Sequence, residues 1–180
     1  LLLPALLAAP GARVVTVSSS AHVPGKIDFA NLDGARSYSA WAAYSQSKLA
    51  NLLFAYELQR RLEAAGASAI SVACHPGWAA TNLQAAGPRM RGSRLGVRLS
   101  ELANRLFAQS AAEGALPTLY AATAPEVRGG DYIGPVELFG SRGAPGKARS
   151  SDRSYDGATA ARLWEASRQL TGVGYEALAP

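Results

Sequence analysis

A long helical pattern between two short β-branched runs limits the folds that this chain can adopt. Residues 12–18 (ARVVTVS) and 69–74 (AISVAC) are continuous, mostly apolar runs, typical of strands buried on both faces of a sheet. Residues 44–65 carry an apolar stripe with helical spacing, made of Leu49, Leu52, Leu53 and Tyr56. Gly66 is a natural helix stop. Strand, helix and strand predict a right-handed βαβ crossover, and therefore an α/β fold with a doubly wound parallel sheet.

The rest of the chain continues this α/β pattern. We predict a helix at 111–123 closed by Pro125, a third strand at 131–138, a loop at 140–154 and a last helix at 157–170 ended by Gly172. Residues 78–108 are rich in Gly and Arg and include an amphipathic stretch at 95–107, which predicts a loop and helix covering a site. The opening residues 1–7 resemble the end of a helix, so we expect a fragment of a longer protein.

Composition and charge narrow the classes of partner. The chain has 180 residues, 48% hydrophobic and 17% charged, which fits one globular unit, and its net charge is +5. The basic residues fall in two loose groups, at 89–105 and 142–153, without aromatic interleaving, so a solvated surface is favoured over a nucleic-acid interface. For the first group, contact with an anionic ligand or a membrane surface is the alternative. Cys74 is the only cysteine, which excludes an internal disulfide and favours a reducing, cytoplasmic location. The apolar opening is too short to span a bilayer, so no membrane span is expected.

Polar residues follow both predicted strands, at the sheet edge where α/β proteins bind their ligands. Ser18-Ser19-Ser20 ends the first strand, and His75-Pro76-Gly77 ends the second. Tyr44 and Lys48 are one helical turn apart, so the phenol and the ammonium share a face of the helix. A cation beside a phenol favours its ionised form, as a general acid/base requires. His22 and His75 have no further ligands at recognisable spacing, so no metal site is predicted.

Three separated segments in this order resemble the short-chain dehydrogenase/reductase family, in its retinol-dehydrogenase-like and protochlorophyllide-reductase-like branch. The matching segments are 13–22 (RVVTVSSSAH), 43–51 (AYSQSKLAN) and His75-Pro76-Gly77 with Thr81. The stretches 115–117 (ALP) and 129–135 (GGDYIGP) resemble the same branch. The resemblance implies an NAD(P)-dependent oxidoreductase that moves hydride between a nicotinamide cofactor and an apolar alcohol or carbonyl substrate. It favours NADP over NAD.

The resemblance also implies roles for individual residues. Tyr44 would be the catalytic acid/base, Lys48 would assist it and bind the nicotinamide ribose, and Ser19 would hold the substrate oxygen. Ser18 and Ser20 remain rivals of Ser19, because three serines in a row leave the register open. Four further residues would contact the nicotinamide end of the cofactor: Pro76, Gly77, Ala79 and Thr81.

The glycine-rich cofactor turn that the family carries is not found near the start of this sequence. We therefore expect residues 1–180 to form a single partial Rossmann-like domain, the carboxyl-terminal part of the fold, without the amino-terminal cofactor-binding half. Alone, this piece is expected to be inactive, because a parallel sheet cut in the middle exposes a strand edge. The alternative is a non-catalytic relative that serves as an association module. In either case the helix at 44–65 could form a homo-oligomer interface.

Overall fold

The computed structural model describes residues 2–78 and 109–178, and it has the α/β architecture that the sequence predicts. The longer elements in chain order are α1 (Leu3–Ala8), β1 (Arg13–Val17), α2 (Ala40–Ala64), β2 (Ile70–Cys74), α5 (Ala111–Thr123), β3 (Tyr132–Glu137), β4 (Arg142–Lys147) and α6 (Gly157–Thr171). The 3-10 turns are η1 (Ser20–His22), η2 (Leu138–Gly140), η3 (Asp152–Tyr155) and η4 (Glu176–Leu178). The predicted loop-helix at 78–108 falls almost entirely outside the described residues.

The four strands form one sheet in the order β1-β2-β3-β4. β1 pairs parallel to β2 from Arg13 opposite Ile70 to Val17 opposite Cys74, and β2 pairs parallel to β3. β4 then runs antiparallel to β3. The predicted βαβ unit is confirmed, because α2 connects the two parallel strands β1 and β2.

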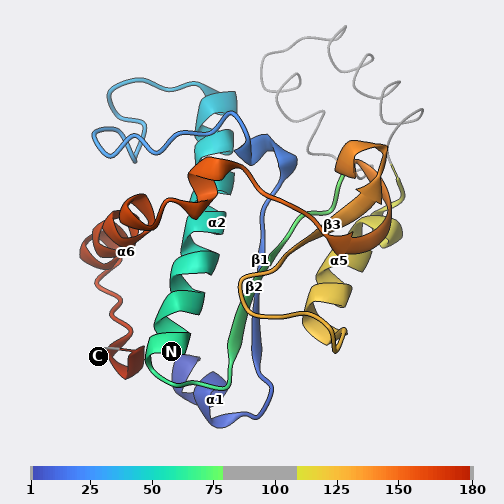
Figure 1. Cartoon of the computed structure of the whole chain (residues 1–180). Coiled ribbons are helices and arrows are strands. Elements are labelled where there is room, and N and C mark those ends of the chain that lie inside the picture. Colours follow the sequence, from blue (N-terminus) through green and yellow to red (C-terminus); the bar gives the residue numbers. More distant parts are fainter. Residues whose placement is uncertain (1, 79–108, 179–180) are drawn as a thin grey trace, which may run out of the picture.

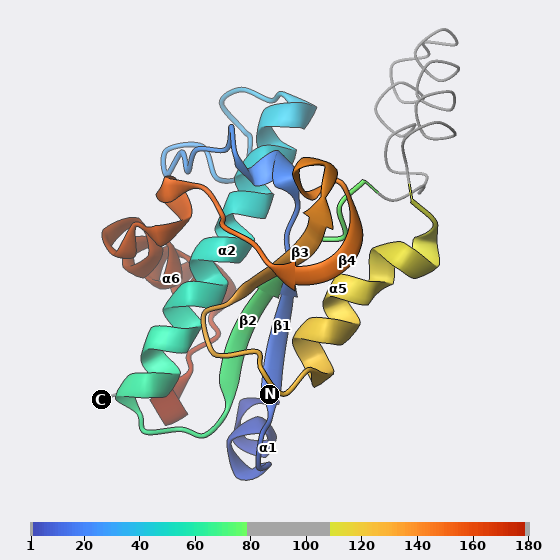
Figure 2. The same ribbon diagram turned by 45° about the vertical axis from the view of Figure 1, so that its right-hand side comes forward.

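Helices cover both faces of this sheet. Figures 1 and 2 show α2 and α6 on one face and α5 on the other. The α2 stripe is buried, with Leu52 and Leu53 at 0% exposure, and it packs on the sheet and on α6. At the carboxyl-terminal end of α2, Leu3 and Leu178 share one apolar cluster with Trp164, so the first and last described elements lie side by side.

The two strands of the βαβ unit differ in burial. β2 is almost fully buried, as predicted, but β1 is only half-buried and Val17 is 41% exposed. The prediction that both strands are covered on both faces is therefore wrong for β1. The reason is its position: within the described part of the chain, β1 is the edge strand and has β2 as its one strand neighbour.

Helix α2 also departs from the prediction in two ways. It begins at Ala40, four residues before Tyr44, so Tyr44 lies in the second turn. Glu57, which the stripe leaves on the solvent side, is buried to 7% exposure and forms ion pairs with Arg60 and Arg61 at 2.7 and 2.8 Å. The helix ends at Ala64, and Gly66 follows with a φ of +65°, which agrees with the predicted stop.

The carboxyl-terminal third contains a strand that the sequence did not predict. Residues 142–147 (RGAPGK) form β4, although we expected a loop there. Glycine and proline lower strand propensity, but Pro145 is tolerated because β4 lies at the edge of the sheet that the described residues form. The two later helices agree with prediction: a capping box of Ser110 and Glu113 opens α5, and Gly172 in a left-handed conformation closes α6.

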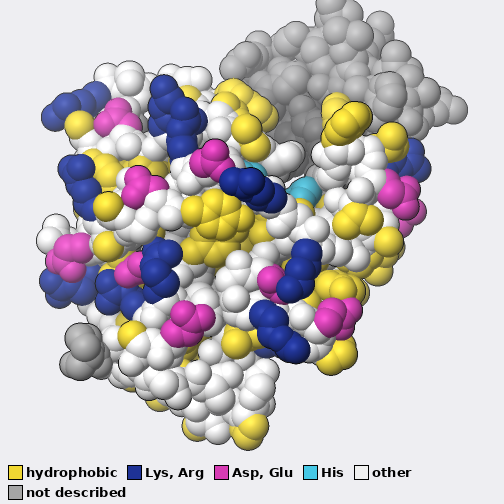
Figure 3. All heavy atoms as spheres, viewed as in Figure 1, with side chains coloured by type: hydrophobic (Ala, Val, Ile, Leu, Met, Phe, Trp, Pro, Cys, Tyr) yellow, Lys and Arg dark blue, Asp and Glu magenta, His cyan; other side chains and the backbone are white. Residues whose placement is uncertain are grey.

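The described surface carries mixed charge. On the face drawn in Figure 3, Lys and Arg are spread out and alternate with Asp and Glu. In the second basic group, Lys147 pairs with Asp131 at 2.9 Å and Arg149 with Asp152 at 2.7 Å. The first basic group, residues 89–105, lies outside the described residues. Among the described helices, none is both long enough and apolar enough to span a membrane.

Candidate active site

The three predicted site segments meet around Ser18. Its backbone N–H donates to the carbonyl of Cys74 at 2.7 Å, which joins the ends of β1 and β2. Its hydroxyl donates to the carbonyl of Lys48 at 2.8 Å, which joins the strand end to α2. The serine segment, the Tyr44–Lys48 turn and the segment that follows Cys74 are thus brought to one edge of the sheet.

The three serines are not equivalent. Ser18 is 2% exposed and its proton is used in the bond to Lys48, whereas Ser20 is exposed at the start of η1. The half-buried Ser19 accepts a hydrogen bond from the N–H of Ala21 at 3.2 Å. The hydroxyl proton of Ser19 has no acceptor among the described residues, so it is available to a ligand oxygen. This geometry favours Ser19 over Ser18, and its binding role stays a prediction.

Tyr44 and Lys48 lie on one face of α2, as their spacing predicts. The Lys48 ammonium is 5.5 Å from the centre of the Tyr44 ring. Trp41, one turn earlier and 60% exposed, packs at a tilt against the same ring at 6.0 Å. Within the described part of the chain, the Tyr44 hydroxyl makes no hydrogen bond and Lys48 makes no ion pair. Both groups are therefore available to a ligand.

The Pro76-Gly77 turn is held on both sides. The N–H of Trp78 donates to the carbonyl of Ser141 at 2.7 Å, and the side-chain amide of Gln109 donates to the carbonyl of Pro76 at 2.7 Å. Gly77 has a φ of +67°, and a Cβ at this position would clash with the Ser141 carbonyl. Glycine is therefore required here both for conformation and for space.

This arrangement fits the nicotinamide end of a dinucleotide. The Lys48 ammonium, which makes no ion pair within the described part of the chain, can donate to ribose hydroxyls. Two of the predicted cofactor residues, Ala79 and Thr81, lie outside the described residues. The roles of Pro76 and Gly77 toward a cofactor stay predictions.

The contacts of Gln109 and Ser141 were not predicted. Gln109 is 4% exposed and also donates its backbone N–H to the Trp78 carbonyl at 2.9 Å. Ser141 contacts the turn through its main-chain carbonyl, and Gln109 contacts it through its main-chain N–H and its side-chain amide. Both residues lie far from the turn in the sequence. No residue pattern could have indicated them.

Two buried histidines surround Tyr132 beside this site. His75 stacks on the Tyr132 ring at 5.1 Å, and His22 meets it edge-on at 5.8 Å. A Cβ at Gly134 would clash with the His75 imidazole, so glycine makes room for this ring. Burial lowers the pKa of both histidines, to about 4 for His75, where the nearby His22 adds to the effect. The described residues contain no cluster of groups that could hold a metal ion.

Acid is expected to destabilise the fold through His75. The unfolded chain binds a proton near the ordinary pKa of 6.5 and the folded chain only near 4, so stability is lost as pH falls through this window. We expect a loss of about 2 kcal/mol in the free energy of unfolding between pH 7.5 and pH 5. Urea unfolding across this range measures it. His75→Gln should flatten the slope but leave the smaller part due to His22, and an unchanged slope would contradict the assignment.

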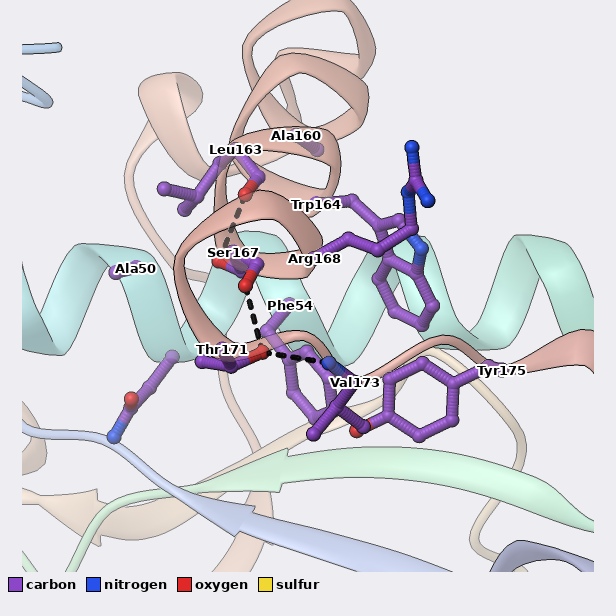
Figure 4. A pocket seen from close by; sticks show the side chains of 11 residues that line it. Ala50, Phe54, Ala160, Leu163, Trp164, Ser167, Arg168, Thr171, Val173 and Tyr175 are labelled. Atoms are coloured by element: carbon purple, nitrogen blue, oxygen red, sulfur yellow. Dashed lines mark hydrogen bonds between the residues drawn. The ribbon is translucent and has the colours of Figure 1, made fainter.

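A separate cavity of about 360 Å³ lies between α2 and α6 (Figure 4). Phe54 and Trp164 stack at 5.6 Å in its wall, and hydroxyls of Ser167 and Thr171 bond to carbonyls one turn earlier on α6. Asn51 also lines it and donates its side-chain amide to the Val17 carbonyl at 2.8 Å. The cavity lining contains none of the predicted site residues.

Comparison with known proteins finds relatives that are dehydrogenases. The chain is 39% identical over 179 residues to polyprenol dehydrogenase from Mus musculus, with 97% of this chain and 50% of the relative aligned. It is 37% identical over 178 residues to retinol dehydrogenase 12 from Homo sapiens, with 98% of this chain and 51% of the relative aligned. The chain thus spans about half the length of the curated relatives it matches. No family model matches it.

A solved structure shows the same fold. It is the crystal structure of a putative uncharacterized protein from Mycobacterium Paratuberculosis, 41% identical, with a TM-score of 0.69 over 91% of this chain and 51% of that chain. The curated relatives named above are dehydrogenases, which are oxidoreductases. Together with the three site segments and the α/β sheet, these matches show that the chain belongs to the short-chain dehydrogenase/reductase family, in its retinol-dehydrogenase-like branch.

Proposed function

We propose that the protein containing this chain is an NAD(P)-dependent oxidoreductase that interconverts an alcohol and a carbonyl compound. The observation that carries the proposal is the convergence at Ser18, whose two hydrogen bonds bring the strand end, α2 and the end of β2 together. Two of these segments supply polar groups without a full set of partners among the described residues, namely the Ser19 hydroxyl, the Tyr44 hydroxyl and the Lys48 ammonium. The family to which the chain belongs is one of oxidoreductases.

In this proposal Tyr44 moves the proton. When a carbonyl is reduced, its oxygen accumulates negative charge, and the Tyr44 hydroxyl donates a proton to that oxygen; in the reverse direction, Tyr44 removes it. The Lys48 ammonium stabilises the phenolate that remains. Ser19 donates its free hydroxyl proton to the same oxygen and holds it in place. A bound nicotinamide, against Pro76 and Gly77, would supply or accept the hydride.

The proposed substrate is an apolar alcohol or carbonyl compound, and the preferred cofactor is NADP. Retinol and polyprenol, which appear in the names of the relatives, are both apolar alcohols. The exposed aromatic side chain of Trp41, beside Tyr44, supports an apolar ligand at this edge of the sheet. The cofactor preference rests on the resemblance to this branch.

We also propose that the dinucleotide-binding half of the fold is supplied by polypeptide outside this sequence. The relatives are about twice as long as the aligned chain, and β1 has an unpaired edge within the described residues. Further parallel strands would pair with that edge. The 180-residue chain alone is then expected to be inactive.

The test uses the protein produced from the start codon of its own gene. It is assayed with all-trans-retinal and a short polyprenal plus NADPH or NADH, and with the matching alcohols plus NADP+ or NAD+. Turnover with at least one pair supports the proposal, and the ratio of kcat/KM values gives the cofactor preference. Failure to bind either reduced cofactor would overturn it.

The association hypothesis has less support. The α2 stripe that it would use is buried within the chain, where Leu49, Leu53 and Ala160 form one cluster. A homo-oligomer through α2 would need other residues, such as the exposed Trp41. Formation of a homo-oligomer through α2 stays part of the proposal, and light scattering, which gives the mass of the protein in solution, tests it. A cytoplasmic location also stays a proposal, supported by the single, buried thiol of Cys74.

A further inference from the structure

His22 connects two segments that are far apart in the sequence. Its Nδ1 lies 2.6 Å from the carbonyl oxygen of Ser19, and its Nε2 lies 3.0 Å from the backbone nitrogen of Ser151. A carbonyl can only accept and a backbone N–H can only donate, so these partners determine the tautomer: Nδ1 carries the proton and Nε2 accepts. His22 is 3% exposed, and burial favours this neutral form.

The segment of residues 150–154, here the Ser151 segment, is itself anchored on α2. The Tyr56 hydroxyl and the Ser150 hydroxyl are 2.8 Å apart, and the Ser150 and Ser154 hydroxyls are 2.6 Å apart, all buried. Tyr56 belongs to the same helix as Tyr44, three turns further along. The Ser151 segment therefore has a defined position relative to the proposed acid/base.

The loop that follows Ser19 is held by the same segment at a second point. Arg153 donates from Nη1 to the carbonyl of Gly25 at 3.2 Å. Gly25 lies so close to α2 that a Cβ would clash with the carbonyl of Ser45. The Ser19 loop is thus enclosed between the first turns of α2 and the Ser151 segment. The His22 side chain, which belongs to this loop, bonds to the Ser151 segment.

We propose that His22 is a positioning residue for Ser19. Through its two hydrogen bonds it transmits the placement of the Ser151 segment to the backbone of Ser19, and so aligns the Ser19 hydroxyl with Tyr44 on the substrate oxygen. This inference rests on the proposed function. It differs from a packing role, which requires a ring that fills space but not a particular tautomer or two specific main-chain partners.

The test removes the backbone N–H group of Ser151, and a matched control accounts for the hydroxyl that is lost with it. Ser151 has a φ of −68°, which proline adopts without strain, so Ser151→Pro deletes the donor to His22. Ser151→Ala is the matched control, because it keeps the N–H and loses a buried hydroxyl that has no hydrogen-bond partner among the described residues. In the protein produced from its own start codon, Ser151→Pro should lower kcat/KM for all-trans-retinal about tenfold, with NADPH affinity unchanged. Ser151→Ala should stay within about twofold of wild type.

A second readout does not depend on turnover. The ¹⁵N shifts of the His22 imidazole distinguish the two neutral tautomers. The wild type and Ser151→Ala should show the Nδ1–H form, and Ser151→Pro should shift the Nε2 signal because this atom loses its donor. Wild-type kcat/KM together with an unchanged His22 spectrum in Ser151→Pro would overturn the inference while the proposed function stands.

A further pair of variants covers the case in which Ser151→Pro does not fold. His22→Asn can still donate to the Ser19 carbonyl, and His22→Gln can still accept from the Ser151 N–H, so each keeps one of the two bonds. Each should lower kcat/KM about tenfold with cofactor binding retained, and wild-type values in both would overturn the inference. If the wild-type protein binds NADPH but turns over no probe, the proposed function fails and the positioning role fails with it.

Discussion

Tyr44→Phe is expected to lower kcat/KM by about 10²- to 10⁴-fold, the usual contribution of a positioned acid/base. The change removes one oxygen atom that has no hydrogen-bond partner among the described residues, so the melting temperature and NADPH affinity should not change. The measurement is steady-state kinetics on the protein produced from its own start codon, with all-trans-retinal or whichever probe the wild type reduces fastest.

Tyr38→Phe is the matched control for this prediction. Tyr38 precedes α2 and is 71% exposed, so the same loss of a phenol oxygen should leave the kinetics unchanged. Equal activity of Tyr44→Phe and Tyr38→Phe would exclude Tyr44 as the acid/base and remove the chemical basis of the proposed function.

Gly77→Ala is expected to lower the free energy of unfolding by about 3 kcal/mol, from left-handed strain of about 1–2 kcal/mol and a steric clash of similar size. Its φ is +67°, and the added Cβ would clash with the main-chain carbonyl of Ser141, which a rotamer change cannot relieve. The turn beside the proposed nicotinamide site should shift as well, so NADPH affinity should fall together with stability. Chemical unfolding and cofactor titration measure the two effects.

Gly66→Ala separates the two causes. Gly66 has nearly the same φ, +65°, but a Cβ there would meet nothing within 4 Å. Gly66→Ala should lower the free energy of unfolding only by the left-handed strain, about 1–2 kcal/mol, and leave cofactor binding unchanged. If Gly77→Ala and Gly66→Ala have equal effects, the close approach of Ser141 to the turn is not a determinant of stability.

The sequence predicted the elements whose signals are local. The periodic stripe of α2, the β-branched run of β2 and the stop at Gly172 depend on a few neighbouring residues, and these predictions are confirmed. The half-buried state of β1 and the strand β4 depend on which elements lie beside them in space. The same β-branched run can form either an edge strand or a central strand, so the burial of β1 could not be predicted from its sequence.

The candidate site divides in the same way. The segments carrying Ser19, Tyr44 and Gly77 were recognisable because their chemistry lies in side chains or in glycine itself. The contacts that hold them run through main-chain atoms: the Lys48 carbonyl under Ser18, the Ser151 N–H on His22 and the Ser141 carbonyl on the turn. Any residue type presents such atoms, so only the fold reveals them.

The bond between the Trp78 N–H and the Ser141 carbonyl has an evolutionary consequence. Adding or deleting one residue between Pro135 and Ser141 would move that carbonyl away from the turn, so insertions and deletions should be rare there. The segment 28–38 is different, because its hydrogen bonds are mostly internal, such as those from the Asn31 side chain to Ser37. Homologous chains are expected to differ in length at 28–38 and to keep their length between β3 and Ser141.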